Sequence, residues 1–306
     1  MGSNIHEAPA TRPEFDVIGA LSPRGRAALI RGWQNASQEL DPDLIGQMAR
    51  TVEAVLGQER LTRPTSSDDV EDAVLSLTEQ FVDYVPDVDR HQLAFVEQRL
   101  GDRAVRHLVH AMYILDQNVR LRIALQRLDL GRPGGSGGTA AVEIPEAKPG
   151  VVRAAAEWHH SVYALRDGLD LRTNELLRLR AGDYHQCAFC LSLRRIAGGE
   201  RVVDPMLEHL LLNYEQSDMP RQFKTALRLA DIYMSDPVRL GSDLRDVLLG
   251  DYSREEIVEI LMVVSACNHQ KIRVALGTAM PARPQGLSEY VVHDDGSIEV
   301  GALISG

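Results

Sequence analysis

The amino-acid sequence has few aromatic side chains, which make up 5% of its residues, and it contains only three cysteines. Scarce aromatics combined with abundant Leu, Ala, Arg, Asp and Glu favour helices over strands. Three cysteines in 306 residues are too few for a disulfide framework. The sequence therefore predicts an all-α protein, and the cysteine usage leads us to expect a cytoplasmic one.

Long apolar runs and an excess of positive charge are also absent. No stretch approaches the roughly 20 apolar residues that a membrane-spanning helix needs, so we expect no membrane association. The first residues have neither the basic nor the apolar region of a secretory signal. A formal net charge of −11 repels phosphate backbones, which argues against nucleic-acid binding.

Residues 130–150 interrupt the helical pattern, because Gly, Pro and small residues dominate them and no period appears. This composition is typical of a flexible linker. The predicted organisation is, in chain order, a mobile tail (1–22), a degenerate helical repeat without a cysteine pair (23–129), the linker (130–150), a helical domain with the cysteine pair (151–282), and a C-terminal tail or β-hairpin (283–306).

The two helical segments share features at a constant spacing. An offset of 151 residues separates three pairs of equivalent positions, namely Pro86 and Pro237, Asp102 and Ser253, and Arg122 and Arg273. Asp and Ser are good N-cap residues, so the middle pair predicts two equivalent helix starts. The constant offset indicates an internal duplication. The alternative is two unrelated helical segments that share common helix signals.

The pair Cys187-Ala-Phe-Cys190 carries the strongest chemical signal. Two cysteines three positions apart at a helix start can close a disulfide with little backbone movement. The free N–H groups of a helix start also lower a thiol pKa, and the thiolate is the form that attacks peroxides and disulfides. The same spacing occurs in metal sites. Zinc or copper held by these cysteines with His185 or His269 is therefore an alternative.

The sequence around this pair resembles the alkylhydroperoxidase D-like, carboxymuconolactone decarboxylase family. Glu175 precedes Cys187 by twelve positions, and the run Glu-Leu-Leu-Arg-Leu-Arg-Ala before Cys-Ala-Phe-Cys is similar to the signature of that family. The resemblance covers about residues 150–280 and implies a helical bundle, here with two repeats in one chain. Members usually form closed cyclic assemblies, so we expect a homo-oligomer.

The resemblance also implies roles for individual residues. Cys190 would be the peroxide-reactive thiol, Cys187 the resolving thiol, and Glu175 the carboxylate end of a proton relay. Phe189 and Arg194 stand where the peroxidases of the family have histidines. An arginine cannot shuttle protons near neutral pH, so the relay needs another base.

Two histidines are candidates for that base. His185 lies two positions before the cysteine pair, and His269 lies on a helix expected to pack nearby. Each candidate also has a purely structural interpretation. Glu175 could pair with Arg178, His185 could end a helix, and His269 could serve helix packing.

Three functions follow from these residues. The first is a thiol-dependent oxidoreductase, of peroxidase or disulfide reductase type, that needs no cofactor and is regenerated by a dithiol reductant protein. The second is a non-redox acid–base enzyme on the same scaffold, acting on a small acid, lactone or specialised metabolite through His185, Glu175 and an arginine. The third is a metal-dependent enzyme. For each of these three functions we expect a small-molecule substrate.

Overall fold

The computed structural model describes residues 8–57, 69–131, 150–165 and 168–301. These residues are mostly helical, which confirms the mainly helical prediction. A small four-stranded sheet is also present, so the fold is not purely helical. Most of the predicted linker, residues 132–149, lies outside the described residues. Within the described ranges, no helix has the length and apolar character needed to cross a membrane.

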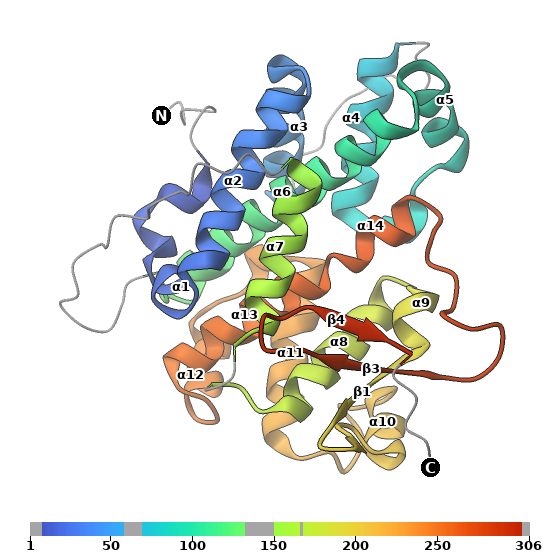
Figure 1. Ribbon diagram of the computed structural model, residues 1–306. Helices are drawn as coiled ribbons and strands as arrows, with labels where there is room; N and C mark the ends of the chain where they lie inside the picture. The colour runs from blue at the N-terminus through green and yellow to red at the C-terminus, as the bar shows by residue number, and fades with distance from the viewer. Residues whose placement is uncertain (1–7, 58–68, 132–149, 166–167, 302–306) are drawn as a thin grey trace.

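The first half of the chain forms nine helical elements within its described residues. They are η1 (Pro9–Thr11), η2 (Pro13–Phe15), α1 (Asp16–Leu21), α2 (Pro23–Glu39), α3 (Pro42–Leu56), α4 (Val70–Tyr84), η3 (Val85–Asp87), α5 (Arg90–Leu100) and α6 (Asp102–Arg127), where η marks a 3₁₀ helix. The long α6 runs through the middle of the molecule (Figure 1).

The second half contains helices and all four strands of the described residues. The helices are α7 (Val151–Tyr163), α8 (Leu171–Tyr184), α9 (Ala188–Leu191), α10 (Pro205–Leu211), α11 (Arg221–Ser235), η4 (Pro237–Arg239), α12 (Ser242–Leu249), α13 (Arg254–Cys267) and α14 (Gln270–Ala275). The strands are β1 (Leu193–Ala197), β2 (Glu200–Arg201), β3 (Ser288–Val292) and β4 (Ile298–Val300).

The predicted start of α13 is correct. Ser253 and Glu256 form a capping box, in which the Ser253 hydroxyl accepts from the Glu256 N–H and the Glu256 carboxylate accepts from the Ser253 N–H. The predicted cap of α6 is wrong by one residue. Gly101, with a φ of 84°, is the N-cap there, and Asp102 is the first helical residue. A glycine adopts this left-handed backbone conformation without strain, which explains why the helix begins there.

The predicted mobile tail also needs correction over its described part. Residues 8–21 form η1, η2 and α1, and Ala10, Phe15 and Ile18 are completely buried. Arg26 on α2 holds the segment in place, because its Nε donates to the Ala10 carbonyl at 2.9 Å. The apolar residues of this short segment are too few to reveal a helical period in the sequence.

The two halves share one hydrophobic core. Helix α7 packs against α2 and α6 of the first half and against α13 of the second (Figure 1). Gly25 on α2 permits the close approach, because a Cβ there would lie 2.7 Å from the Ser161 hydroxyl and 3.0 Å from the Trp158 ring. Trp158 is completely buried at this contact. The two predicted domains therefore bury their apolar faces against each other.

The order of elements recurs between the halves. A helix, a 3₁₀ turn and two further helices follow one another as α4, η3, α5 and α6, and again as α11, η4, α12 and α13. Both α4 and α11 contain 15 residues. This is the order that a duplication would produce. One difference stands out, since α6 is continuous whereas the second series is interrupted at Asn268 and His269 before α14 begins.

The sheet joins the cysteine pair to the C-terminal segment. Its strand order is β2-β1-β3-β4, with β1 parallel to β3 and the outer pairs antiparallel. Strands β3 and β4 form the hairpin that the sequence offered as one alternative for the C-terminal segment. Gly296 at its tip has a φ of 82° and lies against α7, where a Cβ would be 1.7 Å from the His160 carbonyl oxygen. The hairpin is thereby fixed across the second half (Figure 1).

Candidate functional site

The two cysteines of the pair are bonded to each other. After α8 ends, Gln186 adopts a φ of 52° and turns the chain into the short helix α9. Cys187 is the N-cap of α9, and its sulfur accepts from the Cys190 N–H at 3.3 Å. The Cα atoms lie 5.3 Å apart within the disulfide. The pair thus occupies a helix start, as the spacing indicated.

A cavity of about 260 Å³ opens beside this disulfide. Its polar wall includes His159 and Tyr163 from α7, Arg178 from α8, and His269 and Arg273 from the α13–α14 region; Phe189, Leu193, Ile298 and Val300 provide apolar surface. Cys190 lines the cavity, whereas Cys187 is completely buried behind it. Of the two cysteines, Cys190 therefore contributes to the wall of the space in which a ligand can bind.

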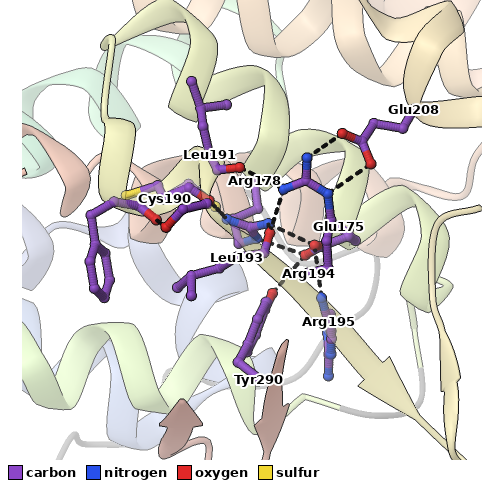
Figure 2. A network of polar contacts seen from close by, with 12 residues as sticks. Glu175, Arg178, Cys190, Leu191, Leu193, Arg194, Arg195, Glu208 and Tyr290 are labelled. Atoms are coloured by element: carbon purple, nitrogen blue, oxygen red, sulfur yellow. Dashed lines mark hydrogen bonds and ion pairs between the residues drawn. The ribbon is translucent and has the colours of Figure 1, made fainter. Parts of the chain in front are cut away.

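A buried ion pair supports the loop that carries the disulfide (Figure 2). Arg178 binds the Glu175 carboxylate through two N–H groups, both at 2.7 Å. The same guanidinium donates to the carbonyl oxygens of Cys190 at 2.7 Å and Leu193 at 2.8 Å. Tyr290 on β3 donates its hydroxyl to Glu175 at 2.6 Å. One carboxylate and one guanidinium thus connect α8, the cysteine loop and the hairpin.

These contacts bear on the expected role of Glu175. Its carboxylate also accepts from the Arg195 N–H at 3.1 Å, and the side chain is 1% exposed. Burial raises the pKa of Tyr290 well above its usual value, so the phenol remains protonated and acts as the donor. These contacts agree with the structural interpretation of Glu175, in which its carboxylate pairs with Arg178. Tyr290 was not found from the sequence, because it lies 115 residues away in a segment without a motif.

His185 does not line the cavity. Its Nε2 is 2.9 Å from the Asn268 side-chain oxygen, and its Nδ1 has no hydrogen-bond partner among the described residues. The Asn268 amide donates in turn to Gln117, which orients its oxygen as an acceptor and places the His185 proton on Nε2. Burial, with Lys271 nearby, lowers the pKa of His185 to about 3. The prediction of a catalytic base at this position is not supported by its placement.

Behind His185, a polar network joins the two halves. Asp116 on α6 binds Arg120 at 2.7 Å and Lys271 on α14 at 2.8 Å, and all three side chains are almost fully buried. Burial by itself raises the pKa of Asp116, but the two cations hold it below its usual value. For Lys271, a cation, burial has the opposite effect and lowers the pKa to about 8. The network fixes the position of the interruption that precedes α14.

His269, at that interruption, does line the cavity. Its ring is 5.4 Å from that of His159, which stacks on Tyr163 at 4.5 Å. Burial lowers the pKa of His159 to about 3 and that of His269 well below its usual value. Both imidazoles are therefore neutral near pH 7. The cluster Trp158-His159-His160 thus contributes to the pocket as well as to the core.

The third cysteine is also part of the cavity wall. Cys267 is buried, and its sulfur is 3.5 Å from the Tyr163 hydroxyl. Burial raises the pKa of Cys267 to about 11, so it remains a neutral thiol at neutral pH. Among the cysteines that line the cavity, Cys190 is the one with a partner for disulfide formation.

The predicted metal ligands are not assembled into one cluster. The sulfurs of Cys187 and Cys190 bond to each other, His269 lies on the cavity wall, and His185 is directed toward Asn268. Over the described ranges, no group of three or more His, Cys, Asp or Glu side chains is arranged around a common point. Zinc or copper binding stays a prediction from the sequence.

Arg194 is buried on β1. It pairs with Glu208 and donates to the carbonyl oxygens of Leu191 and Leu193, each at 2.7 Å (Figure 2). Its guanidinium therefore supports the backbone that follows the disulfide.

Comparison with known proteins adds two relatives. Uncharacterized protein MT2376 and Uncharacterized protein Rv2313c, from two strains of Mycobacterium tuberculosis, are each 28% identical to this chain over 252 residues. The aligned region covers 76% of this chain and 81% of each relative. No family model matches the chain, and no solved structure matches it.

Replacing Glu175 by Gln tests its structural role. The substitution leaves the buried Arg178 without its counter-charge, so we expect the free energy of unfolding to fall by about 3 to 5 kcal/mol. The matched control is Glu215→Gln, which removes the partner of Arg228 at an exposed pair and should cost about 1 kcal/mol or less. Urea denaturation measures both. Equal small losses would contradict the structural role of Glu175.

His185 predicts a pH dependence of stability. Its folded pKa is about 3, against an unfolded value near 6.5, so the unfolded chain binds more protons between these pH values. Stability is fully present above pH 6.5 and falls as the pH drops toward 3. Between pH 6.5 and 5 the His185 contribution is about 2 kcal/mol. Urea denaturation of the His185→Gln variant should show a smaller loss over that interval, and an unchanged pH dependence would exclude this contribution.

Proposed function

We propose that the protein is a thiol-dependent oxidoreductase of peroxidase type, with Cys190 as the attacking thiol and Cys187 as the resolving thiol. The observation that carries the proposal is the placement of the pair. The disulfide-bonded pair lies at a helix start, with Cys190 on the wall of a cavity and Cys187 completely buried. This is the arrangement that a dithiol needs in order to attack a small substrate and then close.

The proposed cycle begins with the reduced pair. The Cys190 thiolate attacks the outer oxygen of a hydroperoxide, an S–O bond forms and the O–O bond breaks, so the sulfur is oxidised to a sulfenic acid and the substrate leaves as an alkoxide. The proton of the Cys190 thiol ends on that alkoxide, giving an alcohol. Cys187 then attacks the Cys190 sulfur, the disulfide forms, and water leaves. A dithiol reductant protein restores both thiols by exchange.

The cavity supplies the polar groups that this step requires. Neutral imidazoles of His159 and His269 each carry one N–H that can donate to the developing alkoxide. Because burial keeps these rings uncharged, they suit hydrogen-bond donation better than proton storage. Arg273 adds a positive charge to the same wall, which favours the thiolate form of Cys190. His269, predicted as the substitute for the missing family histidines, keeps a role in this proposal.

The proposal also includes the family of the fold and its repeats. We infer that the chain is an alkylhydroperoxidase D-like bundle with two repeats, the first having lost its cysteine pair. The recurring element order and the equal lengths of α4 and α11 support this. Because a duplicated chain brings two repeats together, its homo-oligomer would need fewer subunits than that of a single-repeat relative. Regeneration by a dithiol suits a reducing compartment such as the cytoplasm.

One observation favours a second candidate function. His159, His269 and Arg273 line the cavity together, and none of them depends on the disulfide. This set could perform acid–base chemistry on a small acid. Such an enzyme would tolerate the loss of both cysteines, whereas the peroxidase would not.

The proposal is tested by adding one equivalent of an organic hydroperoxide to the fully reduced protein and measuring its intact mass. We expect the loss of two hydrogens, with Cys187 and Cys190 protected from alkylation and Cys267 still reactive after unfolding. The Cys187→Ser variant should stop at a sulfenic acid on Cys190, since its resolving thiol is missing.

The Cys267→Ser variant is the matched control, because it alters the same cavity without touching the pair. It should form the disulfide as the unmodified protein does. If Cys187 and Cys190 both alkylate freely after peroxide treatment, the redox function is excluded. The acid–base function then becomes the leading one.

A further inference from the structure

The cavity contains a cation whose charge no neighbour balances. Arg178 is neutralised by Glu175, and Arg194 by Glu208. The Arg273 guanidinium, by contrast, forms no hydrogen bond or ion pair with any described residue and lies 4.0 Å above the Phe189 ring. Burial lowers the pKa of Arg273 from its usual value, which means that the folded protein bears the cost of desolvating this charge. No Asp or Glu is among the described residues that line the cavity.

The first half shows what this arginine is missing. Arg122, at the same position of α6, reaches Glu53 on α3 at 3.2 Å. Helices α3 and α8 both begin at an aspartate cap, Asp41 and Asp170, whose side chain accepts from the second and third N–H groups of the helix. When the two helices are aligned on these caps, the position equivalent to Glu53 is Gly182. Among its described residues, the second half thus keeps the arginine but has no carboxylate that pairs with it.

We propose that Arg273 binds the carboxylate of a small anionic ligand whose apolar part lies against Phe189, Leu193 and Val300. An arginine can bind a carboxylate through two parallel N–H groups, and such a bond is strong where water is partly excluded. The remaining wall carries apolar side chains, neutral imidazoles, the hydroxyls of Tyr163 and Tyr290, the Gln270 amide and Arg178, whose charge Glu175 balances. This inference rests on the proposed function, because that function makes the cavity the active site. It assigns the substrate class as hydroperoxides that bear a single carboxylate.

The charge balance favours a carboxylate over a phosphate. Arg273 offers one positive charge, because the charge of Arg178 is already compensated. A carboxylate monoanion neutralises it, whereas a phosphate dianion would leave one negative charge in a largely apolar space, which is costly.

Titration calorimetry with hexanoate tests this site on the disulfide form of the protein. We expect hexanoate to bind in the cavity and hexan-1-ol, its uncharged analogue, to bind more weakly. The Arg273→Gln variant should weaken hexanoate binding by about 10- to 100-fold, because it removes charge-assisted hydrogen bonds. Its affinity for hexan-1-ol should not change. Arg122→Gln is the matched control, since it removes the equivalent arginine outside the cavity, and it should leave hexanoate binding intact.

Several outcomes would overturn the assignment. They are an absence of hexanoate binding, equal binding of hexanoate and hexan-1-ol, unchanged affinity in Arg273→Gln, and displacement of hexanoate by an equal concentration of inorganic phosphate. A circular dichroism melt of each variant shows whether it is folded. Because the titration needs no turnover, it is independent of the peroxide reaction. A failed oxidation assay with intact hexanoate binding would exclude the redox function alone.

Discussion

The candidate site depends on the buried ion pair between Glu175 and Arg178. Each of its charges would be costly in the interior by itself. The two side chains form two hydrogen bonds with each other and four with the surrounding chain. Two of these fix the backbone after the disulfide, and one ties the C-terminal hairpin to α8 through Tyr290. The pair therefore holds two elements that line the cavity, the loop with Cys190 and the C-terminal hairpin with Tyr290.

The second constraint is the interruption between α13 and α14. In the first half the long helix α6 continues without a break. In the second half the chain turns at Asn268 and His269, held by the network around Asp116 and Lys271. The turn places His269 on the cavity wall, while Arg273 follows one helical turn later on α14. The first half thus has a definite structural role, since its buried polar residues position the groups that surround the ligand space.

Much of this was predictable from the sequence, because helix starts and the cysteine pair depend on local residues. The capping box at Ser253, the mainly helical fold and the position of the pair at a helix start all follow from short patterns. Long-range placement does not. Tyr290 reaches Glu175 from 115 residues away, and His185, next to the pair in sequence, is directed away from the cavity by Asn268. No local pattern in the sequence indicated β1. The adjacent arginines Arg194 and Arg195 are typical of a solvated face, and the partner that allows Arg194 to be buried, Glu208, lies 14 residues away.

The most direct test of this account is to alkylate the fully reduced, folded protein with less than one equivalent of iodoacetamide and to map the labelled peptide. If the ion pair presents one sulfur to the cavity, Cys190 carries most of the label and Cys187 and Cys267 very little. Preferential labelling of Cys187 or Cys267 would contradict the account, because it would show that the cavity does not expose the thiol on which the proposed chemistry depends.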